Sequence, residues 1–336
     1  MALKLFVVGA NSPTGKHFIE ILRKRRIPYF APSRTQLFPE NAVGIAKMVT
    51  DYGPSQLVNL TDFISGNHSA LRRAETVEDR CQEVNTLLPA TLAEICNHLN
   101  VPMLHLSNAY VFDGEKKLGY NENDEPNPLG VYGRATLEGE RAVAEHNAHI
   151  IIRSGWLFGR WKKGLIKSWI KSAKKNGGQV QVTKRRFSPT HTGDLADAIL
   201  AVCQQVDCDA KVWGTYHYSG LETKRESEFV QQCLKYAASH DEEIYQLLDS
   251  AKMIERESRP PEILNSTLSS KKIFDTFGIK QKTWHGHLQE AIKSLYVSKD
   301  SNKSAHGQQL QDDAASNAES SASSASVDNS AENDAA

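Results

Sequence analysis

The sequence has no long apolar run and few cysteines. No stretch of about 18 apolar residues, the length that a membrane-spanning helix needs, occurs in its 336 residues. The apolar stretch at the N-terminus is too short for a signal peptide. The five cysteines are scattered, with no C-x-x-C motif and no metal-ligand spacing to histidine. We therefore expect a cytoplasmic protein with no membrane partner, no disulfide framework and no metal.

An excess of charge of one sign is also lacking, since 40 lysines and arginines match 40 aspartates and glutamates. This balance gives no reason to expect nucleic acid as a partner. From Asp312 onward every charged residue is acidic, so the rest of the chain carries a modest positive excess that would suit a phosphorylated small ligand. The basic stretch 160–175 could form a surface patch that binds nucleic acid. The spacing of its apolar residues is more typical of a helix with a solvated basic face.

Apolar bulk is almost absent from the last segment, residues 299–336. Such a composition cannot offset the entropy that is lost on ordering, so we expect a disordered acidic tail. Four histidines nearer the middle and end of the chain show no ligand spacing with carboxylates, and we interpret them as structural or exposed: His191, His217, His285 and His287.

The N-terminus predicts a dinucleotide site. Residues 3–8 form an apolar run typical of a buried parallel strand, and an amphipathic helix is expected over 16–26. The turn between them fits G-x-x-G-x-x-G with a serine in the middle position. Its glycines would let the backbone approach a pyrophosphate, and the helix N-terminus would attract the charge. The expected cofactor contacts are Gly9, Asn11, Ser12, Thr14 and Gly15, and a bare structural turn is the alternative.

The next two expected strands favour NADP as the cofactor. The strand over 27–31 is followed by Ser33 and Arg34, where an acidic residue would accept the ribose hydroxyl of NAD. An arginine suits the 2′-phosphate of NADP instead, although NAD stays open and so does a merely solvated arginine. The strand over 56–60 should bring Leu60 and Thr61 to face the cofactor.

A tyrosine lies at the start of a helix expected after the turn signals of residues 126–130. The phenol of Tyr132 could donate a proton to a carbonyl, but its ordinary pKa of about 10 must be lowered by a nearby cation. A lysine one helical turn later would supply that charge, and the residue there is Thr136. The strand expected over 101–107 ends near Asn108, and residues just beyond such a strand end lie in the ligand crevice.

These elements predict an α/β fold, a Rossmann-type doubly wound parallel sheet with a smaller C-terminal α/β substrate-binding part. We expect the first domain over 1–160, with some later segments returning to it, and the substrate-binding part over 161–298. Residues 65–73 are expected to form an irregular loop, and 76–100 a long helical region.

Several segments together resemble the dTDP-4-dehydrorhamnose reductases, an extended branch of the short-chain dehydrogenases. The regulatory beta subunit of methionine adenosyltransferase has the same build. The similar segments occur in the family's order and cover roughly residues 3 to 296. They are the glycine turn, 57–59, Asn85, 106–114, 128–133, 140–142, 153–156, 186–190, 214–220 and 259–260.

The resemblance implies hydride transfer from NADPH to a 4-keto sugar nucleotide. In the family a tyrosine is the acid, a lysine four residues later binds the ribose and lowers the tyrosine pKa, and a serine or threonine polarises the carbonyl. By resemblance Tyr132 is the acid, Thr136 replaces the lysine, and Asn108, with Ser107 before it, replaces the serine or threonine. The residues expected to bind substrate are Tyr110, Trp156 and Arg259.

The two replacements leave two functions open. Asn108 can still donate a hydrogen bond, but Thr136 brings no positive charge, and each unit of lost pKa depression costs the tyrosinate about 1.4 kcal/mol. One hypothesis is an NADP-dependent reductase with an altered catalytic set. The other is a non-catalytic regulatory subunit that binds a dinucleotide or a sugar nucleotide. A homodimer or a regulatory protein partner also stays open.

Overall fold

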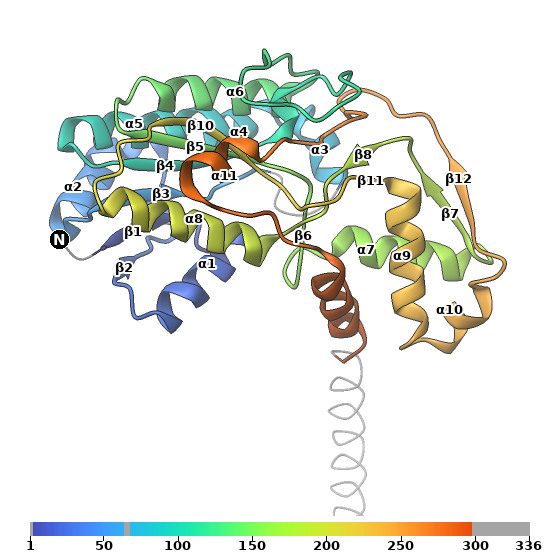
Figure 1. Ribbon diagram of the computed structural model, residues 1–336. Coiled ribbons are helices and arrows are strands. Elements are labelled where there is room, and N and C mark those ends of the chain that lie inside the picture. The colour runs from blue at the N-terminus through green and yellow to red at the C-terminus, as the bar shows by residue number, and fades with distance from the viewer. Residues whose placement is uncertain (1–2, 64–67, 298–336) are drawn as a thin grey trace, which may run out of the picture.

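The computed structural model describes residues 3–63 and 68–297 (Figure 1). The predicted acidic tail at 299–336 lies outside the described residues. Within the part of the chain that is described, no helix is both long and apolar enough to cross a membrane.

The centre of the fold is a parallel sheet of six strands, β1 (Leu5–Val8), β2 (Tyr29–Phe30), β3 (Gln56–Asn59), β4 (Met103–Asn108), β5 (His149–Ser154) and β10 (Gly214–Tyr218). Their order is β10-β5-β4-β3-β1-β2. The order reverses at β1, which has β2 on one side and β3 on the other, so a crevice opens there at the C-terminal ends of the strands. The predicted Rossmann-type fold is therefore confirmed.

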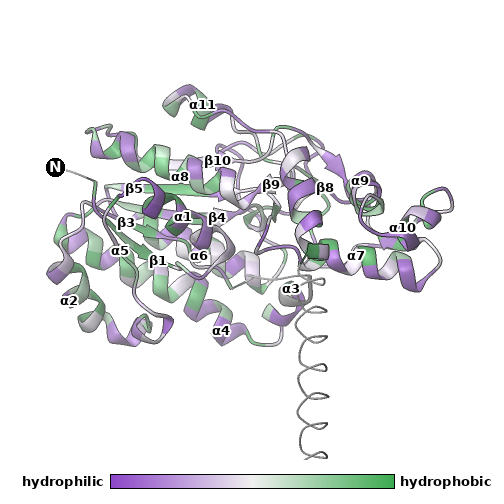
Figure 2. Ribbon diagram, turned by 90° about the horizontal axis from the view of Figure 1, so that it is seen from below, coloured by the Kyte–Doolittle hydropathy of each residue, from purple (hydrophilic) through white to green (hydrophobic). Residues whose placement is uncertain are grey.

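Helices cover both faces of the sheet, as Figures 1 and 2 show. One face carries α1 (Pro13–Lys24), α8 (Thr192–Asp207) and α11 (Lys271–Phe277), and the other carries α2 (Ala42–Tyr52), α5 (Leu88–Leu99) and α6 (Val131–Ala144). Side chains alternate between the two faces along a strand. Accordingly, Leu5 and Val7 of β1 belong to the core under α1 and α8, and Phe6 and Val8 to the core under α2 and α5.

A smaller part with its own core lies to the right of the sheet in Figure 1. It comprises β7 (Gln179–Val182) paired with β12 (Lys252–Glu255), the helices α7 (Gly164–Lys175), α9 (Glu226–Ala238) and α10 (Glu242–Leu247), and the helix over 285–297. Phe229 of α9 lies at its centre, with the rings of Trp156, Trp169 and Phe187 around it. Two short pairs, β6 (Leu157–Phe158) with β9 (Thr190–His191) and β8 (Arg186–Phe187) with β11 (Lys224–Arg225), complete the strands.

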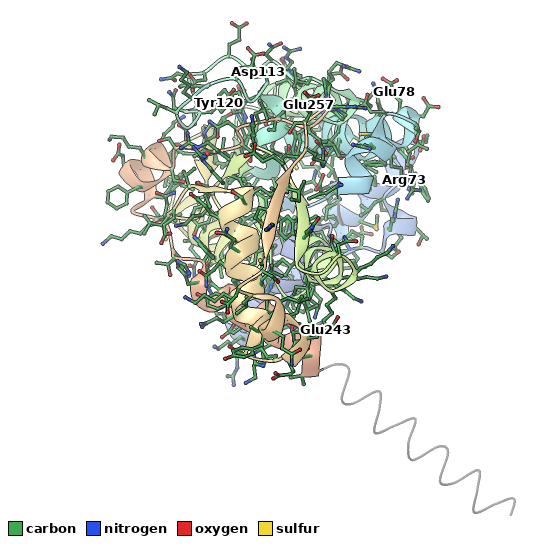
Figure 3. The ribbon with its side chains drawn as sticks, turned by 90° about the vertical axis from the view of Figure 1, so that its right-hand side faces the viewer. Arg73, Glu78, Asp113, Tyr120, Glu243 and Glu257 are labelled. Carbon is green, nitrogen blue, oxygen red and sulfur yellow. The ribbon has the colours of Figure 1, made fainter. Side chains whose placement is uncertain are left out.

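The long connection between β4 and α6 is held by a buried tyrosine. The Tyr120 hydroxyl donates to Asp113 Oδ1 at 2.6 Å, and both residues are labelled in Figure 3. The Tyr120 ring stacks on Phe112 at 4.2 Å. The connection thus leads into α6 in a defined position, and α6 carries Tyr132.

One local prediction was wrong. The described part of the predicted loop 65–73 forms a helix, α3 (His68–Ala74), because Leu71 and Ala74 are buried against α6. Farther along the chain, β5 ends at Ser154, and the short strand β6 follows separately. Helix α8 begins at Thr192, and His191 is its cap residue.

The long helical region after α3 contains a change of helix type. It runs as α4 (Glu78–Gln82), a π-helical turn over Glu83–Leu87 and then α5. Such turns are frequent at functional sites. Here the turn presents Asn85, which contacts both α6 and the loop after β3.

Candidate functional site

A cleft of about 650 Å³ opens at the C-terminal ends of β1, β2 and β3. Gly9, Asn11 and Ser12 line it from the glycine turn. The backbone there is tightly packed. Gly9 has φ +83°, and a Cβ on it would lie 2.5 Å from the carbonyl carbon of Leu60. A Cβ on Gly15 would lie 2.1 Å from the carbonyl oxygen of Gly9. Only glycine therefore fits at these two positions, where the turn packs against the loop after β3 and against the start of α1, as in the glycine turn of a dinucleotide-binding fold.

Ser12 has a structural reason to occupy the middle position of the motif. Its Oγ accepts a hydrogen bond from the backbone N–H of Gly15 at 3.0 Å and caps α1. Thr14, Gly15 and Leu60 lie behind the surface of the cleft rather than among its lining residues.

We predict that Gly15→Ala lowers NADPH affinity at least tenfold, because the added methyl group must push the start of α1 away from Gly9. The matched control is Gly44→Ala. Its methyl group would meet only the Asn41 side chain, which can move. Fluorescence titration with NADPH measures both variants. Equal affinities for Gly15→Ala and the parent would show that the turn is not the cofactor cradle.

Three arginines are among the residues that line this cleft. Arg34 begins the 3₁₀ turn after β2 and lines the cleft, as do Arg73 of α3 and Arg80 of α4. The Ser33 side chain instead bonds to Thr35 and Gln36 within that turn. Arg73 and Arg80 were not predicted from the sequence, because only the packing of α3 and α4 brings them to the cleft.

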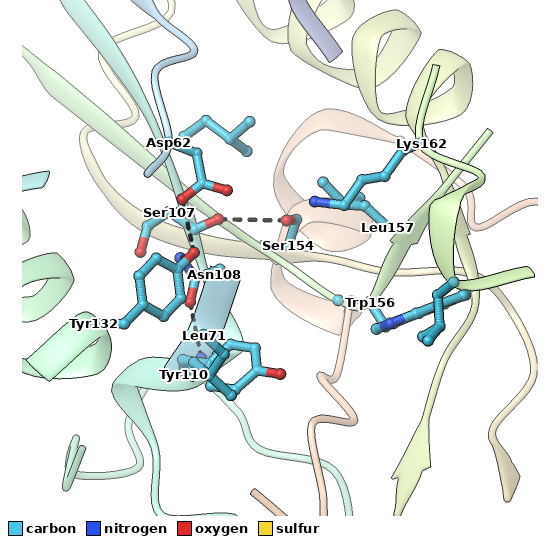
Figure 4. A pocket seen from close by; sticks show the side chains of 13 residues that line it. Asp62, Leu71, Ser107, Asn108, Tyr110, Tyr132, Ser154, Trp156, Leu157 and Lys162 are labelled. Carbon is cyan, nitrogen blue, oxygen red and sulfur yellow. Dashed lines mark hydrogen bonds between the residues drawn. The ribbon is translucent and has the colours of Figure 1, made fainter. Parts of the chain in front are cut away.

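A second cavity of about 100 Å³ lies at the C-terminal ends of β4 and β5 (Figure 4). Predicted catalytic and substrate residues line it together, namely Ser107, Asn108, Tyr110, Tyr132 and Trp156. Asp62 lines both this cavity and the cleft, so the two spaces meet at that residue. Arg259 is exposed at the surface and is not brought to the cavity.

The Tyr132 hydroxyl is held between two side chains. It donates to Asp62 Oδ1 at 2.7 Å and accepts from Asn108 Nδ2 at 2.7 Å. The Asn108 amide is oriented in turn, because its Oδ1 accepts from the backbone N–H of Tyr110 at 2.9 Å. Burial, and then the charge and hydrogen bond of Asp62, raise the pKa of the Tyr132 phenol well above its ordinary value.

Asp62 is a functional candidate that we did not predict from the sequence. The signal for it was weak, because it stands three residues after the last residue of β3. Asn59 fixes the intervening turn, since its Oδ1 accepts from the backbone N–H and the hydroxyl of Thr61. The turn thereby directs Asp62 into the cavity.

Thr136, in the position of the family's lysine, is part of a buried hydrogen-bonded joint. Its hydroxyl donates to the Tyr132 carbonyl at 2.8 Å and accepts from Asn85 Nδ2 at 2.9 Å. Asn85 Oδ1 accepts from the backbone N–H of Phe63 at 3.0 Å. The joint connects α6 to the π turn and to the loop after β3, and it contains no charge.

The Ser107 hydroxyl is also committed to a structural contact. It donates to the Glu140 carboxylate, which forms a buried ion pair with Arg153 at 2.6 Å. A second bond joins Arg153 Nε to Glu140 at 2.9 Å. Ser107 thus belongs to the support of the cavity more than to its reactive surface.

Two of the histidines that we interpreted as structural lie beside Asp194, despite the absence of a spacing signal. His287 Nε2 is 3.2 Å from Asp194 Oδ1, and the rings of His191 and His287 stack at 3.9 Å. One ligand atom from each of the three residues lies within 4.8 Å of the others. Lys282 is 3.2 Å from the same carboxylate oxygen and already offsets its charge, so we retain the structural interpretation.

The glycine turn at β1, the arginine after β2 and the tyrosine of α6 beside the crevice define a Rossmann-type protein of the short-chain dehydrogenase class. Residues 3–297 match the family described as RmlD substrate binding domain, so the chain belongs to that family. The family predicted from the sequence is thereby confirmed.

Individual relatives are similar over most of the chain. The dTDP-4-dehydrorhamnose reductase of Sinorhizobium fredii is 31% identical over 261 residues, which cover 75% of this chain and 84% of that protein. A dTDP-4-dehydrorhamnose reductase crystal structure from Clostridium acetobutylicum has 25% identity and a TM-score of 0.72, and the match covers 87% of this chain and 99% of that one. The Bacillus anthracis reductase, solved in complex with NADP, is similar in fold at 22% identity and a TM-score of 0.71, with 86% and 97% coverage.

Proposed function

We propose that the protein binds NADP and reduces the keto group of a nucleotide-linked 4-keto sugar with an altered catalytic set. Relatives named dTDP-4-dehydrorhamnose reductase support the substrate class, and a structure of one of them in complex with NADP supports the cofactor. When bound, NADPH supplies the hydride. The residues of this chain bind the two ligands, orient the sugar and deliver the proton.

The observation that supports this proposal most directly is that Asp62 lines both the cleft and the cavity. The cleft suited to a dinucleotide and the cavity that contains Tyr132 meet there. A cofactor in the cleft would therefore extend toward the cavity, and a sugar in the cavity would lie next to Tyr132 and Asn108. Tyr110 and Trp156 offer ring surfaces for the sugar within the same space.

The test is the loss of NADPH absorbance when the protein is mixed with a dTDP-4-keto-6-deoxy sugar. We expect slow turnover that depends on the sugar, and slower turnover still with the Gly15→Ala variant when NADPH is below saturation. If NADPH protects the protein against heat unfolding but no 4-keto sugar nucleotide supports turnover, the reductase proposal is wrong.

A second candidate is a non-catalytic regulatory subunit on the same scaffold. The uncharged joint at Thr136 and the raised pKa of Tyr132 favour it, because both act against a tyrosine acid. Binding of NADP without turnover would support this candidate, and capture of a stable protein partner would then define its role. Light scattering would show whether the chain forms a homodimer.

We predict that Arg34→Glu shifts cofactor preference from NADP toward NAD by at least tenfold. The guanidinium lines the cleft where a 2′-phosphate would lie, and a carboxylate would repel that phosphate and accept a ribose hydroxyl. Lys24→Glu, an equal charge change on the exposed end of α1, is the control. Competition titrations with NADPH and NADH measure both, and an unchanged ratio for Arg34→Glu would contradict the assignment.

A further inference from the structure

A lysine from outside α6 reaches the cavity. Lys162 follows β6, and its backbone N–H donates to the carbonyl of Gly159 at 2.9 Å. Gly159 itself is confined, since a Cβ on it would lie 2.5 Å from Thr192 Oγ1. This turn holds the backbone while the Lys162 side chain lines the cavity. Figure 4 shows that side chain entering from the side opposite Tyr132.

The adjacent lysine points elsewhere. Lys163 Nζ donates to Ser294 Oγ at 3.0 Å, on the helix over 285–297. Lys163 is not among the residues that line the cavity. The two neighbours therefore differ in position while sharing charge and length, which makes Lys163 a matched control for Lys162.

Four neutral side chains that line the cavity already donate hydrogen bonds to other groups of the protein. Tyr132 donates to Asp62, and Asn108 donates to Tyr132. The Ser107 hydroxyl donates to Glu140, and that of Ser154 to the Ser107 carbonyl at 3.4 Å. The carbonyl oxygen of a bound sugar could accept a hydrogen bond from one of these donors only if an existing bond were broken. None of these donors is as acidic as an ammonium group whose pKa has been lowered by burial.

The surroundings of Lys162 suit a proton donor. Burial lowers the pKa of its ammonium group, and the Asp62 carboxylate opposes that shift. A buried lysine with a lowered pKa gives up its proton more readily than one in solvent. The nearby carboxylate keeps the protonated form populated before the reaction.

We propose that Lys162 donates the proton to the carbonyl oxygen of the bound sugar, in place of a tyrosine activated by a lysine on α6. The inference rests on the proposed reductase function and names the acid of that reaction. Tyr132 and Asn108 then act as positioning residues that hold Asp62 next to the cavity.

The step balances as follows. The carbonyl carbon receives a hydride from bound NADPH, and a new C–H bond forms. The π electron pair moves to the oxygen, which takes a proton from Lys162 Nζ as that N–H bond breaks. The products are an alcohol, NADP⁺ and a neutral amine, which regains its proton from water.

The step requires protonated Lys162, so kcat should fall as pH rises through the pKa of Lys162, below the ordinary value for lysine. Among the described residues, the other titratable groups that line the cavity are Asp62, Tyr110 and Tyr132. Burial raises the pKa of both tyrosines. They should therefore stay neutral across this range, and the fall should belong to the lysine.

The test compares Lys162→Met, Lys162→Arg, Lys163→Met and Tyr132→Phe in the NADPH assay. We expect Lys162→Met to lower kcat by roughly a hundredfold or more, the scale of a general acid, with KM and NADPH affinity nearly unchanged. Lys162→Arg should be similarly slow, because a guanidinium keeps its proton. Lys163→Met should match the parent, and Tyr132→Phe should keep at least a tenth of its activity.

The possible results separate the two proposals. Parental kcat in Lys162→Met, or a loss of activity confined to Tyr132→Phe, overturns the role of Lys162 and leaves the reductase function intact. Absence of turnover in the parent, with NADPH bound, overturns the reductase function and the donor role with it. If Lys162→Met fails to fold, Lys162→Arg is the test. A kcat of Lys162→Arg equal to that of the parent would exclude a proton donor at this position.

Discussion

Replacing Glu140 by alanine is expected to lower the free energy of unfolding by about 3–5 kcal/mol. The side chains of Glu140 and Arg153 are only 4% and 7% exposed, and they pair at 2.6 Å. Alanine would leave the guanidinium charge buried without its carboxylate and would also remove the acceptor of the Ser107 hydroxyl. Denaturation by urea measures the change.

The control for this prediction is Asp51→Ala. Asp51 pairs with Lys47 at 2.9 Å, but both side chains are more than half exposed, so the loss should be about 0.5 kcal/mol or less. A loss below about 1 kcal/mol for Glu140→Ala would mean that the buried pair does not hold β4, β5 and α6 together.

Thr136→Lys is expected to raise turnover about tenfold or more, because it would add a tyrosine acid at Tyr132 to the donor proposed at Lys162. The lysine would bring a cation next to a phenol whose pKa is raised by burial and by Asp62. Each unit by which that pKa falls makes proton donation from the phenol more favourable by about 1.4 kcal/mol. The variant should also lose stability, because it breaks the joint between Thr136 and Asn85. The NADPH assay and a thermal melt measure the two effects.

Thr136→Met is the control for the charge, because its side chain breaks the same joint with similar bulk and no cation. It should lose stability without gaining turnover. If Thr136→Lys gains nothing over Thr136→Met, a cation at residue 136 does not make the Tyr132 phenol a competent acid.

The strands and most helices were predictable because their patterns are local. An apolar run before the glycine turn identified β1, and the amphipathic pattern after that turn identified α1. Helix α3 was not predictable in the same way. Its short segment has no strong periodicity, and it forms because Leu71 and Ala74 find a partner surface on α6.

The placing of residues in one cavity was predictable where resemblance fixed a position along the chain. Tyr132, Asn108 and Tyr110 lie together in the cavity, as their positions near the ends of β4 and at the start of α6 indicated. Asp62 and Lys162 were not predicted, because each arrives from a turn whose direction depends on contacts between distant segments. Among the described residues that line the cavity, these two bear the charges. The proposed chemistry therefore rests on residues that sequence patterns alone did not identify.

The most direct test of the central claim is the transfer of deuterium from NADPH labelled at the transferring position of its nicotinamide ring. The protein would be incubated with this cofactor and a dTDP-4-keto-6-deoxy sugar, and the sugar nucleotide would be examined by mass spectrometry. The proposed function predicts a product that carries one deuterium at the carbon of the former carbonyl. The role of Lys162 predicts that this product accumulates roughly a hundredfold more slowly in Lys162→Met. Bound NADPH with no label in the sugar after prolonged incubation would contradict it.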